Sequence, residues 1–136
     1  ISYTGNNRTH MIRVPDSGRF ELRLMDGSVN PYLLQAGVIA AGIDGIENKR
    51  DPGQPLFVNM YTDGDNYPNI KKLPSDLEAA LDHLSNNKEL LLAFGEKIIK
   101  SYLKLKKQEL KDFNSKETFS KKDPITDWEK ANTLDC

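Results

Sequence analysis

The feature that most constrains this chain is its longest uncharged apolar run, which extends from Pro31 to Ile43. Asn30 can cap a helix whose first residue is Pro31, where the missing N–H costs nothing, and the pattern predicts a helix to about Glu47. The run of about thirteen residues is shorter than the roughly 20 that cross a bilayer. Because its sequence is apolar on all sides and contains several Gly and Ala residues, we expect a buried helix that other elements enclose.

Composition narrows the class of protein. The 136 residues are 38% hydrophobic and 29% charged, and the net charge of −1 excludes a strongly cationic nucleic-acid binder. The single cysteine, Cys136, can form neither an internal disulfide nor a zinc cluster, which favours a reducing, cytoplasmic setting with no membrane partner. Since the chain opens on Ile1 with strand-forming, arginine-bearing sequence, we expect it to be the tail of a longer protein.

Two strands are predicted near the N-terminus, over His10–Val14 and Arg19–Met25. Pro15 to Gly18 between them are turn residues, so the two strands should form an antiparallel hairpin. In the second strand, alternation places Phe20, Leu22 and Leu24 on one face and charged residues on the other.

The C-terminal half reads as helical. Ser75 with Glu78 forms a predicted capping box for one helix, and a second helix should run from about Lys88 to Phe113. Its apolar stripe would contain Leu91, Phe94, Ile98, Tyr102 and Leu105. Thr126 with Glu129 predicts a short last helix. The fold class is therefore α+β, with a sheet-bearing part over residues 1–74 and a helical part over 75–136.

The arginines are segregated, since four of the five lie in the first two dozen residues: Arg8, Arg13, Arg19 and Arg23. A planar guanidinium binds phosphate or carboxylate through two parallel hydrogen bonds, whereas lysine is a hydrated point charge. Glu21, between Arg19 and Arg23 on the charged strand face, offers a hard oxygen ligand for a divalent cation. The pattern fits a phosphate and metal site; the alternative is a solvated charged ladder without a ligand.

Four strings occur in an order and spacing similar to those of glutamine synthetases: NNRTHMIRVP, GRFELR, NPYLLQAGVIAAGIDGIENK and PGQPLFVNMY. Together they cover about Tyr3 to Tyr61, and as an ordered set they are specific. The remainder, with YLKLKKQEL and DWEKANTLDC, resembles the bacterial type III branch more loosely. The chain thus resembles the C-terminal part of the glutamine synthetase catalytic domain, and the hairpin would belong to its barrel.

The resemblance implies a role for each site residue. Glu21 would be a ligand of Mg²⁺ or Mn²⁺, Arg13 would contact the ATP phosphates, and Arg19 would lie near the nucleotide. Arg8 would contact both the transferred phosphate and glutamate, and Arg23 would hold the glutamate carboxyl group. The loop between Arg13 and Arg19 is shorter than in many relatives and lacks the lysine that some of them use for ATP.

The family reaction, as the resemblance implies it, forms γ-glutamyl phosphate from ATP and glutamate, after which an amine displaces the phosphate. Ammonia is the first choice of amine and methylamine the alternative, because the selecting residues would lie upstream. The resemblance also implies large homo-oligomeric rings, and an isolated chain that is inactive. A rival from another class is a non-catalytic binding or assembly module that retains the fold.

Three further residues have simpler interpretations. His10 lacks a second ligand at metal-binding spacing and is interpreted as a hydrogen-bonded structural group, and His83 as a solvated one. Tyr61 matches a tyrosine that some bacterial relatives adenylylate, but the sequence after it differs, so we expect no modification.

Overall fold

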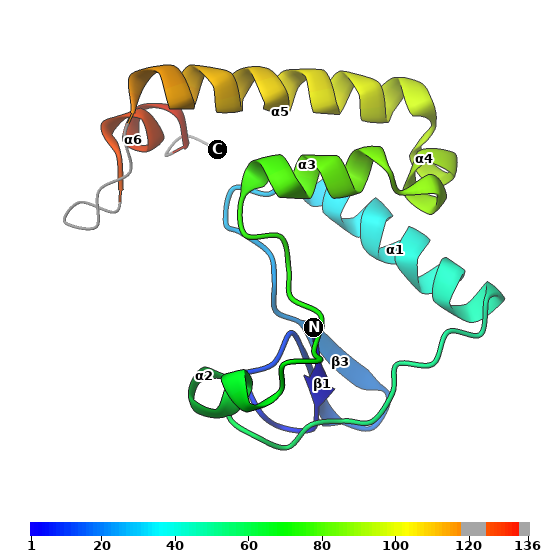
Figure 1. Cartoon of the computed structure of the whole chain (residues 1–136). Helices are drawn as coiled ribbons and strands as arrows, with labels where there is room; N and C mark the ends of the chain where they lie inside the picture. Colours follow the sequence, from blue (N-terminus) through cyan, green and yellow to red (C-terminus); the bar gives the residue numbers. More distant parts are fainter. Residues whose placement is uncertain (118–124, 134–136) are drawn as a thin grey trace. The chain divides into compact units, whose positions relative to one another are not determined.

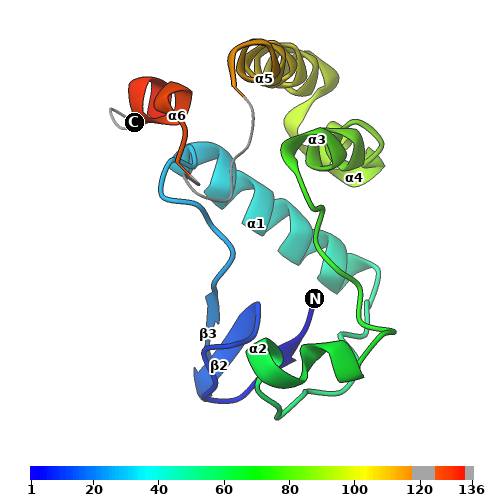
Figure 2. The same ribbon diagram turned by 60° about the vertical axis from the view of Figure 1, so that its left-hand side comes forward.

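The structure is a computed structural model that describes residues 1–117 and 125–133. Cys136, and with it the prediction about cysteine pairing, lies outside the described residues. The chain divides into two compact units (Figures 1 and 2). The sheet unit comprises Ile1–Val29 and Arg50–Leu73, and the helical unit comprises Asn30–Lys49 and Pro74–Cys136. Each unit is described separately below.

The sheet unit contains three strands in the order β1 (Tyr3–Thr4), β2 (Ile12–Asp16) and β3 (Arg19–Leu22). Strands β2 and β3 are antiparallel, which confirms the predicted hairpin, whereas the short β1 pairs with β2 in parallel and was not predicted. The expected four-residue turn is wrong, because Pro15 and Asp16 belong to β2 and only Ser17 and Gly18 turn the chain. Gly18 has φ 73°, a conformation that a residue without Cβ adopts freely.

The β2–β3 pairing contains a register shift. Arg13 pairs with Glu21 and Asp16 with Arg19, so β2 holds one more residue than β3 between these two pairs. Pro15 lies within this bulge, a position where the ladder does not require a backbone N–H and a proline is therefore tolerated. The bulge shifts the register so that Arg13, rather than Val14, lies opposite Glu21.

The connection that follows position 49 returns to the sheet unit. The Leu56 N–H donates to the Tyr3 carbonyl at 3.0 Å, and the Tyr3 hydroxyl donates to the Gly53 carbonyl at 2.8 Å. This connection contains the short helix α2 (Met60–Asp63), which Asn59 caps, and the 3-10 turn η1 (Gly64–Asn66). Thr4 and His10 are buried in this unit.

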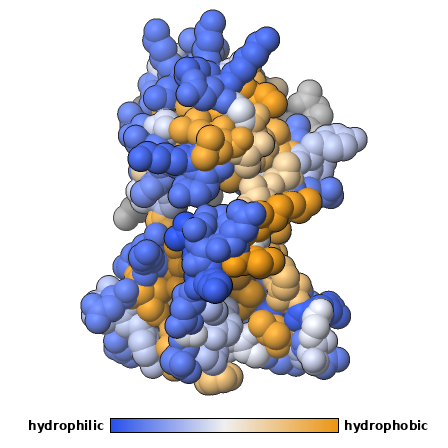
Figure 3. Space-filling model, turned by 90° about the vertical axis from the view of Figure 1, so that its right-hand side faces the viewer, coloured by the Kyte–Doolittle hydropathy of each residue, from blue (hydrophilic) through white to orange (hydrophobic). Residues whose placement is uncertain are grey.

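The helical unit begins with α1 (Pro31–Glu47), whose bounds and cap confirm the sequence prediction. The Asn30 side chain accepts from the N–H groups of Tyr32 and Leu33 at 3.0 and 3.1 Å. The described residues do not provide the expected enclosure, since no residue of α1 is buried, and Tyr32 and Ile46 are 83% and 79% exposed. Apolar areas of the surface are visible in Figure 3. Among the described residues, no helix is long and apolar enough to span a bilayer.

One apolar contact of α1 does lie within the unit. Helix α1 packs against α4 (Lys88–Phe94), and a Cβ built on Gly37 would lie 3.9 Å from the Phe94 ring. The small side of α1 therefore allows the close approach that its Gly and Ala content predicts. The rest of its apolar surface needs partners that the described residues do not supply.

The prediction of one continuous helix over Lys88–Phe113 is wrong. The segment forms two helices, α4 and α5 (Glu96–Lys116), separated at Gly95, whose φ of 80° is incompatible with an α-helix. The break changes the phase of the apolar face. Ile99, rather than Ile98, is therefore the buried residue of α5, and the predicted stripe member Leu105 is 61% exposed.

Two capping predictions have different outcomes. Asp76, not Ser75, caps α3 (Leu77–Ser85) by accepting from the Ala79 N–H at 2.8 Å. The second box is confirmed: at α6 (Asp127–Thr133) the Thr126 N–H donates to the Glu129 carboxylate at 2.8 Å, and the Glu129 N–H donates to the Thr126 hydroxyl at 3.1 Å. Helices α3 and α5 pack together around buried Leu81 and Ile99.

Candidate functional site

The charged face of the β2–β3 hairpin gathers three of the four predicted arginines. Arg13 on β2 is the cross-strand partner of Glu21 on β3, so both side chains project from the same face. Strand alternation brings Arg19 and Arg23, two residues on either side of Glu21, to that face as well. The cluster of Arg13, Arg19, Glu21 and Arg23 is called the Glu21 cluster below.

Glu21 is the centre of the contacts. The Arg13 Nη1 donates to both carboxylate oxygens of Glu21, at 2.9 and 2.8 Å. The Arg19 Nη2 donates to one of these oxygens at 2.7 Å, and the Arg23 Nη1 lies 3.8 Å from the other. The Arg13 side chain is 12% exposed and the Glu21 side chain 25%, whereas Arg19 is 66% exposed. Arg13 is therefore the inner partner and Arg19 the outer one.

The electrostatics of the cluster favour an ionised carboxylate. The hydrogen bond from Arg13 lowers the pKa of Glu21 below its usual value, and the charges of Arg13 and Arg19 act in the same direction against the opposing effect of desolvation. Arg13 is itself held on its far side, because its Nε donates to the Asn6 amide oxygen at 2.9 Å. The sequence analysis did not identify this role of Asn6, for which the only signal is its position just before the arginines.

Arg8 does not join the Glu21 cluster. It lies on the loop between β1 and β2, with its side chain exposed, and the ion pairs of Glu21 come from Arg13, Arg19 and Arg23. The four segregated arginines therefore do not all converge on Glu21, because Arg8 precedes β2 and lies outside the hairpin that aligns the other three. The role that the sequence predicts for Arg8 stays a prediction.

A divalent cation could take Glu21 as one ligand only. Mg²⁺ and Ca²⁺ prefer six or more oxygen ligands. No group of three His, Cys, Asp or Glu side chains within the described ranges could hold a metal ion. The chemistry of Glu21 fits a metal ligand, since it is a carboxylate kept ionised by its neighbours, but the described residues hold no set of three such side chains around it.

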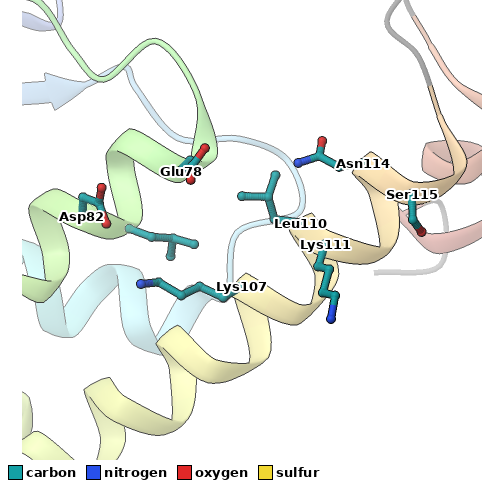
Figure 4. Close-up of a pocket in the computed structure, with 8 residues that line it drawn as sticks. Glu78, Asp82, Lys107, Leu110, Lys111, Asn114 and Ser115 are labelled. Carbon is teal, nitrogen blue, oxygen red and sulfur yellow. The ribbon is translucent and has the colours of Figure 1, made fainter.

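Two of the hollows among the described residues have charged side chains in their lining, and one of these two adjoins the cluster. It measures about 390 Å³ and is lined by Glu21, Leu22, Arg23 and Met25. The other, of about 520 Å³, lies between α3 and α5, and Figure 4 shows acidic side chains from α3 and lysines from α5 around it. It contains none of the predicted site residues, so the candidate site is the hollow beside the Glu21 cluster.

Comparison with known proteins supplies the family. The model of the glutamine synthetase catalytic domain matches residues 1–124. The chain belongs to the glutamine synthetase family. The family match includes the β2–β3 hairpin, and with it every residue of the Glu21 cluster.

Individual relatives include proteins with two different names. The glutamine synthetase of Rhizobium meliloti (strain 1021) is 47% identical over 135 residues, which cover 99% of this chain and 29% of that protein. The glutamate–methylamine ligase of Methyloversatilis universalis is 39% identical over 138 residues, with 99% and 29% covered. The solved apo structure of GmaS matches with a TM-score of 0.82 at 43% identity, over 100% of this chain and 30% of that one. This chain thus spans about three tenths of the length of these relatives.

Proposed function

We propose that this chain is the C-terminal portion of the catalytic domain of an ATP-dependent glutamate ligase. The observation that carries the proposal is the Glu21 cluster, in which three arginines on one face of the β2–β3 hairpin converge on one carboxylate. Phosphoryl transfer depends mainly on positioning and on neutralising charge, and such an arrangement supplies both. Membership of the glutamine synthetase family supports the same reaction class.

Each site residue has a proposed role. Arg13 and Arg19 bind the phosphates of ATP, and Arg23 binds the glutamate carboxyl group. Arg8 contacts glutamate and the phosphate that is transferred. Glu21 supplies one oxygen ligand to Mg²⁺ or Mn²⁺, and the ion, when bound, would neutralise phosphate charge.

In the proposed reaction, the γ-carboxylate of glutamate attacks the γ-phosphorus of ATP, which releases ADP and gives γ-glutamyl phosphate. An amine then attacks the γ-carbonyl carbon and loses a proton, and inorganic phosphate leaves. The arginines compensate the negative charge that moves between the oxygens of the transferred group. Their fixed hydrogen-bonding geometry suits this task better than flexible lysines would.

Ammonia is the proposed amine, and methylamine is the second candidate. The 47% identity to a glutamine synthetase favours ammonia. The second candidate has independent support in the relative named glutamate–methylamine ligase. The proposal further includes a cytoplasmic location, large rings of identical subunits, and a division of the domain into a sheet-bearing part over residues 1–74 and a helical part over 75–136.

The test uses the full-length protein that contains this chain, supplied with ATP, Mg²⁺ and glutamate. Phosphate release is measured with ammonia or methylamine in turn, and the product is identified by mass spectrometry. The preferred amine is the one with the higher kcat/KM. If no phosphate were released with either amine, the proposed ligase activity would be contradicted and the non-catalytic module would be favoured.

A charge-conserving variant ties the activity to the Glu21 cluster. Arg13→Lys keeps one positive charge but loses the planar group that contacts both Glu21 and Asn6. We expect it to lower kcat/KM by at least about tenfold, as removal of a transition-state contact commonly does. Arg50→Lys, which changes the one arginine outside the first two dozen residues, is the matched control and should leave kcat/KM near the wild-type value.

A further inference from the structure

The loop that carries Arg8 has no strand to hold it. β1 ends at Thr4 and β2 begins at Ile12, so Arg8 lies in the middle of an irregular connection. Its nearest backbone hydrogen bond within the loop joins the Asn7 N–H to the Gly5 carbonyl at 2.9 Å. The position of Arg8 must therefore depend on contacts that its neighbours make with other segments.

These neighbours bind one short segment, residues 58–60, which lies some fifty positions later. The Asn7 side-chain amide donates to the Val58 carbonyl at 3.0 Å. The Met60 N–H donates to the Thr9 hydroxyl at 3.0 Å. Both segments belong to the sheet unit, and Figures 1 and 2 both draw α2, which begins at Met60, beside the strands.

His10 is the innermost member of this set, with only 3% of its surface exposed. One ring nitrogen, Nε2, lies 2.8 Å from the Val58 carbonyl oxygen, and because a carbonyl only accepts, this nitrogen carries the hydrogen. The other, Nδ1, lies 2.9 Å from the Ser2 hydroxyl, which donates to it when the ring is neutral. The ring thus connects the segment before β1, the Arg8 loop and residues 58–60.

We propose that His10 is a positioning residue, which sets the place of Arg8 in the active site by fixing the Arg8 loop to Val58. The inference rests on the proposed function, since Arg8 is given its glutamate and phosphate contacts there. The Val58 carbonyl accepts from both Asn7 and His10. If the His10 ring is removed, the Val58 carbonyl keeps the hydrogen bond from Asn7 but loses the one from His10, and space opens in the interior. The loop then loses its most buried attachment.

The consequence for catalysis follows from geometry. Displacement of a substrate-positioning group by about 1 Å can cost on the order of a hundredfold in rate. We expect His10→Leu, in the full-length enzyme, to lower kcat/KM for glutamate by about tenfold or more. His10→Gln, whose side-chain amide can still donate to the Val58 carbonyl, should recover most of that loss.

The assay compares these variants by steady-state kinetics with glutamate varied, and by melting temperature to establish folding. His83→Leu is the matched control, because His83 lies on α3 with its side chain exposed, and it should retain wild-type kcat/KM. Equal losses in His10→Leu and His10→Gln would overturn the proposal, since the hydrogen bond to Val58 would then be irrelevant. So would a wild-type kcat/KM in folded His10→Leu.

A double-mutant cycle separates positioning from a general structural role. If His10 acts through Arg8, His10→Leu should lower kcat/KM far less when Arg8 is already Lys than in the wild-type background. A full, multiplicative loss in the double variant would overturn the inference while leaving the proposed function intact. An Arg8→Lys enzyme with wild-type kcat/KM would instead overturn the role proposed for Arg8, and this inference with it. Should His10→Leu not fold, Ser2→Ala, which removes only the Nδ1 partner, takes its place in the cycle, with a smaller expected loss.

Discussion

Gly95 separates α4 from α5, and Gly95→Ala tests why the chain breaks there. Gly95 has φ 80° and ψ 139°, a region of backbone space that residues with a Cβ rarely enter. A Cβ built at this position meets no atom within 4 Å, so the substitution causes no clash and its cost is backbone strain alone. Strain of this kind costs about 1–3 kcal/mol, and we expect Gly95→Ala to lower the free energy of unfolding by that amount.

The variant has a second route open to it. Alanine favours a helix interior by about 1 kcal/mol over glycine, so α4 and α5 could join into one helix. That would turn the apolar face of α5 and remove Ile99 from the core that it forms with Leu81. Burial of an Ile side chain is worth about 1.5–3 kcal/mol, so this route brings a loss of similar size. Both routes predict destabilisation.

Urea unfolding of the wild type and two glycine variants, followed by far-ultraviolet circular dichroism, measures the effect. Gly42→Ala is the matched control, because Gly42 lies inside α1, has no positive φ, and also has open space around a built Cβ. It should stabilise the helix by about 1 kcal/mol, the opposite sign. If Gly95→Ala proved as stable as the wild type, or stabilised the protein as Gly42→Ala should, the argument from backbone strain would be refuted.

Two further predictions concern carboxylates with lowered pKa values. In the full-length enzyme, Glu21→Gln should weaken Mg²⁺ binding and lower turnover, and wild-type activity at limiting Mg²⁺ would contradict the role as metal ligand. Hydrogen bonds from the Thr126 backbone and side chain lower the pKa of Glu129, so its contribution to stability is present above the unfolded-state pKa and is lost as pH falls through the folded one. Trp128 fluorescence should therefore show that α6 unfolds as the pH falls. In Glu129→Gln this fluorescence change should depend less on pH than in the wild type.

The hairpin and its charged face could be predicted because both follow from local patterns. Turn residues between two alternating segments specify a hairpin, and alternation alone brings Arg19, Glu21 and Arg23 together. The inner partner, Arg13, was also expected to contribute to this site, although its pairing with Glu21 depends on register. The bulge at Pro15 sets that register, and the sequence offers only the proline itself as a hint.

Other features depend on partners that are distant in sequence. β1 is two residues long and is a strand only because β2 lies beside it, so no periodicity could reveal it. The His10 contacts join residues about fifty positions apart, and the same histidine alone looks like any isolated polar group. A helical pattern on both sides of Gly95 concealed its positive φ.

Local charge matters more for this site than the net charge of the chain. The net charge of −1 arises because acidic residues outnumber basic ones by three outside the Glu21 cluster, whereas the cluster itself holds three guanidinium groups and one carboxylate. The cluster therefore carries a surplus of two positive charges, concentrated on one face of the β2–β3 hairpin. Like charges held so close repel one another, and Glu21 compensates only part of that repulsion. An anionic ligand would relieve the remainder, which is the physical reason for proposing phosphate contacts at this face.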